Sequence, residues 1–225
     1  MIKKWTVVVP IYNDRKSLEI LLQEIAKSDF SEGIFLIVDN GSTDESVLSQ
    51  NLTSMPNVLF LRTEKNLGFG GGIKFGLRNA TTDWVGWMPG NLKVHPSRLT
   101  IFEPIILGDN FDLIKAKRVG RSRQATFKTL LAGIIQSLIL RRNMLDTGGT
   151  PTFIRRDYLE KLYNAPDDYV FESYVLYIAR KLNFRISRPE VAYGDRLFGQ
   201  SHWQRGVNAE VNLMKNIVRQ SKTWK

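Results

Sequence analysis

The feature of this 225-residue chain that most restricts its fold is a series of short apolar runs, each followed by a polar loop. The run 5–10 (WTVVVP) is rich in β-branched and aromatic residues, and 34–38 (IFLIV) and 58–61 (VLFL) are similar. Strands that are covered on both faces of a parallel sheet have such continuous apolar sequences. Between the first two runs, apolar residues recur at the spacing of a helix, at Leu18, Leu21, Leu22 and Ile25. The order predicts an α/β fold with a mostly parallel, doubly wound sheet.

A fourth apolar run, 84–88, ends at Pro89 and Gly90, which are typical of a turn. Asn91 therefore follows a strand directly, at the edge where open α/β sheets bind ligands. This stretch alone also fits an ordinary surface turn, and both interpretations stay open. Polar loops follow all four runs, at Tyr12, Asp39, Asn66 and Asn91. Because these loops fall on one edge of the predicted sheet, that edge is the expected nucleotide site.

The charge and cysteine content restrict the partners and the compartment. The net charge of +10 indicates an anionic partner, which includes nucleotide phosphates, anionic lipid and nucleic acid. No nucleic-acid-binding motif is present, so phosphate and membrane partners are expected to account for the charge. The chain has no cysteine, which agrees with a cytoplasmic location. The longest apolar segment, 130–140, is too short to span a bilayer.

Three motifs carry a resemblance to a known family. They are VVVPIYND at 7–14, VDNGSTD at 38–44 and NLGFGGG at 66–72. In this order and spacing they resemble the opening motifs of family-2 glycosyltransferases. The resemblance implies the GT-A fold of nucleotide-diphospho-sugar transferases.

The second half of the chain narrows the resemblance. A predicted strand at 112–119 leads into an arginine-rich turn, and helical spacing then extends over 127–139. This order is similar to that of dolichyl- and polyprenyl-phosphate sugar transferases of the dolichol-phosphate mannosyltransferase type. The resemblance covers about residues 5–203, so we expect a GT-A domain at 1–203 and an amphipathic helical extension at 204–225.

For the donor, the resemblance implies a site built mainly from the first two loops. Asp39 would accept a hydrogen bond from the base or ribose, and Asp14 replaces a longer Glu that is usual in the family. Asn40 replaces a common second Asp, an exchange expected to matter less. The implied donor-binding residues are Pro10, Tyr12, Asp14, Asp39, Gly71, Asn91, Arg196, Ser201 and His202.

The metal-binding motif is the main departure from the family. Family members usually carry Asp-x-Asp after the fourth strand, whereas this chain has Pro89-Gly90-Asn91. Asn91 offers a carbonyl oxygen without a formal charge, so Mg²⁺ or Mn²⁺ is expected to bind weakly or to be dispensable. Arg196 and His202 would share the stabilisation of the leaving diphosphate. The expected catalytic residues are Arg196, Asn91 and Asp146.

For the acceptor, the residues and the resemblance together indicate a polyprenyl phosphate. Arg118, Arg121 and Ser122 precede the predicted helix, and arginine side chains suit phosphate oxygens. A phosphate acceptor is already ionised near neutral pH and needs no strong base. Asp146 and Glu172 are the nearest candidate bases, and either is also a candidate structural residue. The helix would lie against lipid or pack on the sheet, and both positions stay open.

The sequence therefore predicts an inverting glycosyltransferase, peripheral on the cytoplasmic membrane face, that moves a sugar from a nucleotide-diphosphate sugar to a polyprenyl phosphate. Two other functions remain open. One is a glycosyltransferase with a soluble sugar or glycan acceptor. The other is a catalytically silent nucleotide-sugar-binding subunit, which the altered Asp-x-Asp position would favour.

Overall fold

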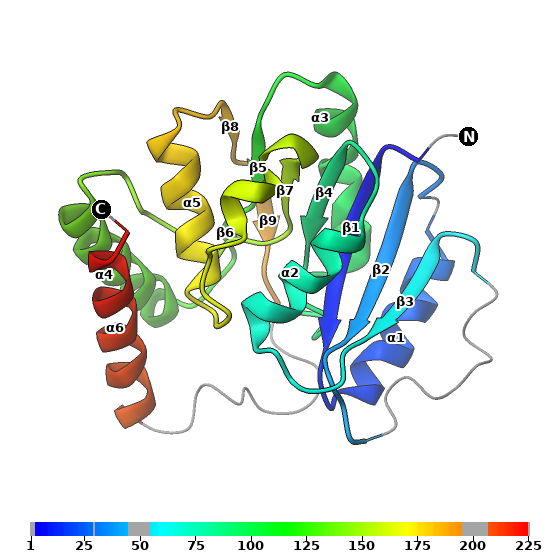
Figure 1. Ribbon diagram of the computed structural model, residues 1–225, viewed down its shortest axis with the longest axis horizontal. Helices are drawn as coiled ribbons and strands as arrows, with labels where there is room; N and C mark the ends of the chain where they lie inside the picture. The colour runs from blue at the N-terminus through cyan, green and yellow to red at the C-terminus, as the bar shows by residue number, and fades with distance from the viewer. Residues whose placement is uncertain (1–2, 29, 45–54, 195–206, 225) are drawn as a thin grey trace.

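The computed structural model of the protein describes residues 3–28, 30–44, 55–194 and 207–224 (Figure 1). A seven-stranded sheet has the order β3-β2-β1-β4-β7-β5-β8. Strand β7 is antiparallel to both neighbours, and the other pairs are parallel, as predicted. The strands are β1 Trp5–Ile11, β2 Gly33–Asp39, β3 Val58–Arg62, β4 Trp84–Trp87, β5 Leu113–Lys115, β7 Thr152–Arg155 and β8 Ile186–Ser187.

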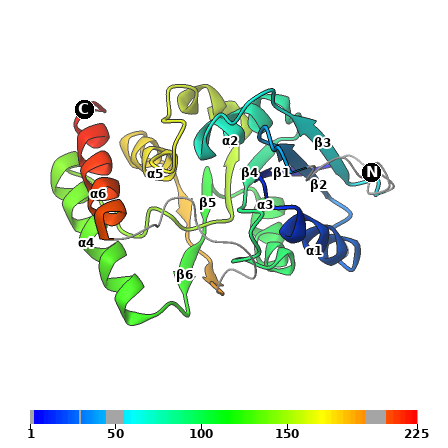
Figure 2. The same cartoon turned by 90° about the horizontal axis from the view of Figure 1, so that it is seen from below.

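Helices cover both faces of this sheet, because successive strand residues point to opposite sides. In β1, Val7 and Val9 join the core formed with α1 and α3, whereas Val8 joins the core formed with α2 and α5. Figure 2 shows the helices on the two sides of the sheet. The helices are α1 Arg15–Ala26, α2 Phe69–Asn79, η2 Pro96–Ile101, α3 Glu103–Gly108, η3 Arg156–Leu162 and α5 Phe171–Lys181.

The carboxyl ends of the first strands meet at one edge of the sheet, as predicted. Ile11 at the end of β1 pairs in register with Asp39 at the end of β2. Strand β4 runs parallel to β1 on its other side, so Met88 and the turn at Asn91 follow at the same edge. The polar loops after β1, β2 and β4 therefore lie together.

The predicted single strand at 112–119 is wrong, because the chain changes sheets at Ala116. β5 belongs to the main sheet, but β6 (Lys117–Val119) pairs with β9 (Glu190–Ala192) in a separate two-stranded sheet. The Ala116 N–H donates to the Pro151 carbonyl, and the next N–H, of Lys117, donates to the Pro189 carbonyl. This change of partner directs β6 away from the main sheet and toward helix α4.

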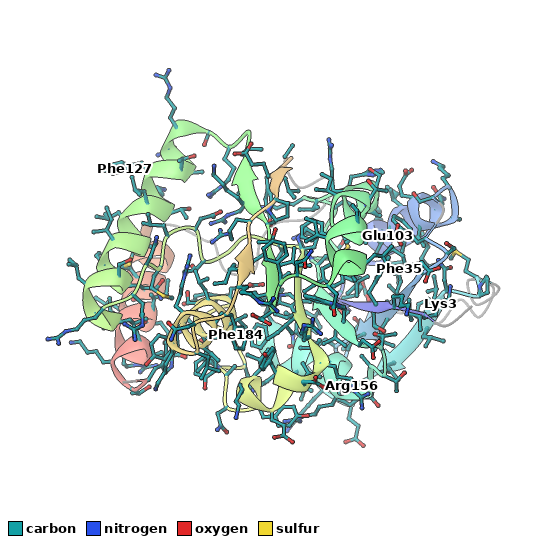
Figure 3. All side chains as sticks on the ribbon, turned by 90° about the horizontal axis from the view of Figure 1, so that it is seen from above. Lys3, Phe35, Glu103, Phe127, Arg156 and Phe184 are labelled. Atoms are coloured by element: carbon teal, nitrogen blue, oxygen red, sulfur yellow. The ribbon has the colours of Figure 1, made fainter. Side chains whose placement is uncertain are left out.

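Helices α4 (Arg123–Leu140) and α6 (Val207–Lys222) lie side by side, beyond α5 and away from the sheet (Figures 1 and 2). Of the two positions left open for the predicted helix at 127–139, the one packed on the sheet is therefore wrong. Phe127 points outward from α4 in Figure 3 and is 65% exposed, and Leu138 is 76% exposed. Within the described residues, no helix combines the length and apolar character needed to cross a membrane.

Candidate functional site

The carboxylate of Asp39 is the most buried acidic group at the carboxyl edge of the sheet. The residue is fully buried, and its Oδ1 accepts a hydrogen bond of 2.9 Å from the Ser42 N–H. The Arg62 Nε lies 3.4 Å from Oδ2 and forms an ion pair, but Oδ2 accepts no hydrogen bond from the described residues. A buried oxygen with spare acceptor capacity is uncommon in folded proteins and suits a ligand donor.

The loops after β1 and β2 are tied together beside Asp39. Asn13 adopts a positive φ of 49°, its N–H donates to Ser42 Oγ, and its Oδ1 accepts from the Thr43 N–H. Asp14 occupies the N-cap position of α1, but its side chain makes no capping hydrogen bond. These contacts fix the loop that carries Tyr12 and Asp14, two of the predicted donor-binding residues.

Asn40 connects the end of β2 to the glycine-rich loop, a role that the sequence did not indicate. Its Nδ2 donates to the Gly68 carbonyl (2.9 Å) and to Asn66 Oδ1 (3.3 Å). Its Oδ1 accepts from the Leu67 N–H (3.1 Å) and from Thr63 Oγ1 (3.4 Å). An amide is required here because the side chain both donates and accepts.

The substitution Asn40→Asp is therefore expected to lower the free energy of unfolding by ~1–3 kcal/mol, because a carboxylate cannot donate to Gly68 and Asn66. Urea denaturation measures this change. Asn66→Asp is the control, since Asn66 Oδ1 acts as an acceptor toward both Asn40 and Gly68. An equal loss in both variants would contradict the role of the Asn40 amide.

The glycines of the loop allow a close approach to the segment that precedes α5. Gly68 has a φ of +81°, and a Cβ at Gly70 would lie 2.4 Å from the Pro166 carbonyl oxygen. The N–H of Gly71, a predicted donor-binding residue, donates to the Asp167 carbonyl (3.0 Å). The loop is thus packed against the chain itself, and donor binding by Gly71 stays a prediction.

Asn91 lies in the turn after β4, and its Oδ1 accepts a hydrogen bond of 3.2 Å from the Lys93 N–H. Residues 3–28, 30–44, 55–194 and 207–224 contain no cluster of three acidic or histidine side chains that would hold a metal ion. Mg²⁺ and Mn²⁺ bind several oxygen ligands, usually with carboxylates among them. The described residues around Asn91 do not by themselves form such a site.

A cavity of about 670 Å³ lies between α4, α6 and the N-terminus of α5. One part of its wall carries cationic side chains, from Arg118, Arg121 and Lys128. Another part is apolar and comes from both long helices and the start of α2. The apolar residues are Phe69, Leu131, Ala132, Met214 and Ile217.

Two of the predicted acceptor residues, Arg118 and Arg121, line this cavity together. Arg118 lies against the Tyr193 ring, with its guanidinium carbon 5.8 Å from the ring centre. Arg121 donates to Thr129 Oγ1 and to the Ala125 carbonyl, which directs it along the first turns of α4. Burial, and then the charge of Arg118, lower the pKa of Arg121. Ser122 also lines the cavity and caps α4 by accepting from the Ala125 N–H.

Asp146 is held between two arginines. Its Oδ1 accepts from Arg118 Nε (2.5 Å), and its Oδ2 accepts from the Arg118 N–H (3.0 Å) and from Arg188 Nη2 (3.2 Å). The sequence did not indicate Arg188, which is 42 residues further along than Asp146 and reaches the site only through the fold. Burial lowers the pKa of Arg188, and the Asp146 charge opposes that shift. Asp146 thus positions Arg118, and its catalytic role stays a prediction.

Glu172, the other candidate base, forms a buried ion pair in the cavity floor. Its Oε2 accepts from Lys115 Nζ (2.5 Å), and its Oε1 accepts from Trp87 Nε1 (2.6 Å). Lys115 is fully buried and also donates to the Gly149 carbonyl and to Thr152 Oγ1. Burial lowers the pKa of Lys115, and Glu172 opposes that shift. Both oxygens of Glu172 are therefore engaged by cationic or neutral donors of the protein itself.

The remaining predicted site residues divide into two groups. Pro10 lies near the end of β1, beside the loop of Tyr12. Arg196, Ser201 and His202 lie outside the described residues, and their roles stay predictions.

Comparison with known proteins identifies the family. A model of glycosyl transferase family 2 matches residues 6–163. An undecaprenyl-phosphate 4-deoxy-4-formamido-L-arabinose transferase from Photorhabdus laumondii is 25% identical over 226 residues, which cover 96% of this chain and 67% of the relative. A relative of the same name from Yersinia enterocolitica is 23% identical over 228 residues, with the same shares covered.

Solved structures share the fold. Glucosyl-3-phosphoglycerate synthase from Mycobacterium tuberculosis, in complex with Mn²⁺, uridine diphosphate and phosphoglyceric acid, superposes with a TM-score of 0.71 at 18% identity. The match covers 97% of this chain and 77% of that one. S. aureus TarS in complex with UDP-GlcNAc gives a TM-score of 0.61 at 22% identity, covering 95% of this chain and 66% of that one.

The family match extends over more than half of the chain, and the sheet order and the solved structures agree with it. The predicted GT-A fold is confirmed. The protein is a glycosyltransferase that belongs to glycosyl transferase family 2.

Proposed function

We propose that this glycosyltransferase moves a sugar from a nucleotide-diphosphate sugar to a polyprenyl phosphate. The observation that carries the proposal is the cavity beside α4, which combines Arg118 and Arg121 with an apolar wall. Arginine binds phosphate oxygens through paired hydrogen bonds, and apolar side chains suit an isoprenoid chain. The names of the relatives support the same acceptor class, since both are undecaprenyl-phosphate transferases.

The state of the two carboxylates also favours a phosphate acceptor. Asp146 is paired with Arg118 and Arg188, and Glu172 is paired with Lys115. A hydroxyl acceptor needs a base to remove its proton, whereas a phosphate monoester is already ionised at neutral pH. The phosphate oxygen would form a bond to the anomeric carbon as the bond from that carbon to the diphosphate breaks. The nucleoside diphosphate leaves with the electron pair, and the configuration at carbon inverts.

On the donor side, we propose that the free acceptor capacity of Asp39 Oδ2 binds the base or ribose. Pro10, Tyr12 and Asp14 would enclose the nucleoside, and Arg196, Ser201 and His202 would contact the diphosphate. The relatedness to glucosyl-3-phosphoglycerate synthase, whose complex contains Mn²⁺ and uridine diphosphate, supports a nucleotide-sugar donor. A divalent cation would be held weakly, because Asn91 supplies no charge.

We also propose that α4 lies on an anionic membrane surface. Its exposed side carries large apolar residues, and Arg141 and Arg142 follow the helix directly. Apolar side chains beside cations are the composition that binds interfacial lipid. The exposed apolar residues are Phe127, Leu130, Leu131, Ile134 and Leu138.

The variant Phe127→Ser/Leu138→Ser is expected to bind vesicles of anionic phospholipid at least about a hundredfold more weakly, because each lost side chain contributes ~1.5–3 kcal/mol when fully buried in lipid. Vesicle sedimentation measures the affinity. Leu107→Ser is the matched control, since Leu107 is 52% exposed on α3, distant from α4. Unchanged binding of the double variant would exclude α4 as the membrane surface.

The test of the whole proposal is transfer from a panel of nucleotide sugars to a short polyprenyl phosphate in detergent, with Mg²⁺, with Mn²⁺ and with chelator. Turnover with one donor is expected and would identify the sugar. Activity that persists in chelator would show that the turn at Asn91 works without a cation. Nucleotide binding without transfer would favour the catalytically silent subunit. Transfer to a soluble sugar and not to polyprenyl phosphate would show that the proposed acceptor is wrong.

A further inference from the structure

The C-terminal helix α6 supplies part of the cavity wall. Met214 and Ile217 line the cavity, as do Leu131 and Ala132 of the neighbouring helix α4. Figures 1 and 2 show α6 alongside α4 and far from α1 and the strands β1, β2 and β3. The family model matches residues 6–163, so α6 is a part of the site that lies outside that match.

Several polar contacts hold α6 in a fixed position. Ser221 is fully buried and accepts from Gln136 Nε2 of α4 (3.2 Å). Asn216 Nδ2 and Gln220 Nε2 both donate to Asp168 Oδ2, at 2.8 and 2.9 Å. The Tyr177 hydroxyl donates to the Trp224 carbonyl. Because these bonds lie along the length of its second half, this part of α6 forms a defined wall.

The cavity has a cationic part and an apolar part, which would orient a bound amphipathic molecule. Arg118, Arg121 and Lys128 provide positive charge, whereas Met214 and Ile217 provide apolar surface with no charged atom. An acceptor that satisfies both has an anionic head group joined directly to an apolar chain. Methionine adapts to irregular apolar ligands because it is unbranched and polarisable.

We infer that Met214 and Ile217 contact the isoprene units beyond the first one after the acceptor phosphate, so that α6 determines the preference for acceptors with a prenyl chain. This inference rests on the proposed function. Each buried methylene group contributes favourable free energy, so successive isoprene units should improve the acceptor until the wall is covered. This gain depends on the length of the apolar chain and not on the phosphate, which is the same in every acceptor.

The test uses the full chain and a series of monophosphates with one, two, three and more isoprene units. With wild type, kcat/KM is expected to rise with each of the first units. In Met214→Ser/Ile217→Ser, kcat/KM for the three-unit acceptor is expected to fall on the order of tenfold to a hundredfold. For the one-unit acceptor the expected loss is less than about threefold, so the dependence on chain length becomes flat.

Val218→Ser is the matched control, because Val218 is adjacent to Ile217 but faces a separate surface hollow with Lys215 and Arg219. It is expected to keep the wild-type dependence on chain length. An unchanged double variant, or an equal loss with every acceptor, would overturn the inference while the proposed function stands. Failure of wild type to use any prenyl phosphate would overturn the proposed function itself, and the inference with it.

Discussion

Replacing Arg118 and Arg121 together by alanine is expected to raise the KM for polyprenyl phosphate on the order of a hundredfold, with the KM for the nucleotide sugar changed by less than about threefold. Both guanidinium groups line the cavity, and charge-assisted hydrogen bonds from arginine to phosphate are among the strongest polar contacts. Removing one partner of such a contact costs ~2–5 kcal/mol when it is shielded from solvent. Steady-state kinetics with each substrate varied in turn measures the two KM values.

The matched control is Arg123→Ala. Arg123 begins α4 and is exposed, and it does not line the cavity, so its loss removes one positive charge from the same segment without the proposed contact. Arg188 still pairs with Asp146 in the double variant, which limits the structural cost of removing Arg118. If the KM for the donor rises and that for the acceptor does not, the assignment of the two substrates to the two parts of the site is wrong.

The sheet and its functional edge were predictable because they depend on short-range patterns. Continuous apolar runs indicated β1, β2, β3 and β4, and the structure confirms each of them. A parallel sheet places all their carboxyl ends on one edge, so the position of Asp39 among the other loops followed without knowledge of any contact. Arginines clustered at the end of a predicted strand likewise indicated Arg118 and Arg121.

The position of α4 was not predictable, because an apolar helical pattern is the same for a helix in a core and one on a surface. Only the departure of β6 from the main sheet places α4 beyond α5, and the change at Ala116 depends on Pro151 and Pro189, both distant in sequence. The contribution of α6 to the cavity was missed for the same reason. Its helical pattern indicates the helix but not its neighbour.

The buried pair of Lys115 and Glu172 was also missed. Lys115 occurs in a strand with Lys117 two residues later, and this pattern is typical of a solvated strand face. The partner is 57 residues away and lies on helix α5, which follows β7 and η3 in the chain. A single sequence contains no signal for such a pairing, whose energy depends on desolvation in the finished fold.

Lys115→Met is expected to lower the free energy of unfolding by ~3–5 kcal/mol, because it leaves the Glu172 carboxylate buried without its cation. Methionine fills a similar volume, so a cavity contributes little to the loss. The Gly149 carbonyl keeps a donor in this variant, since Thr152 Oγ1 also donates to it. Urea denaturation followed by tryptophan fluorescence and by circular dichroism measures the change.

A second substitution distinguishes the loss of the charge partner from any other effect of Lys115→Met. In Lys115→Met/Glu172→Gln the amide oxygen still accepts from Trp87 Nε1, and no net charge remains in the cavity floor. A buried neutral amide costs far less than an unpaired carboxylate. The double variant is therefore expected to be more stable than Lys115→Met by ~1–3 kcal/mol. If it is no more stable than Lys115→Met, packing around Lys115 and not its charge holds β5, β7 and α5 together beneath the acceptor cavity.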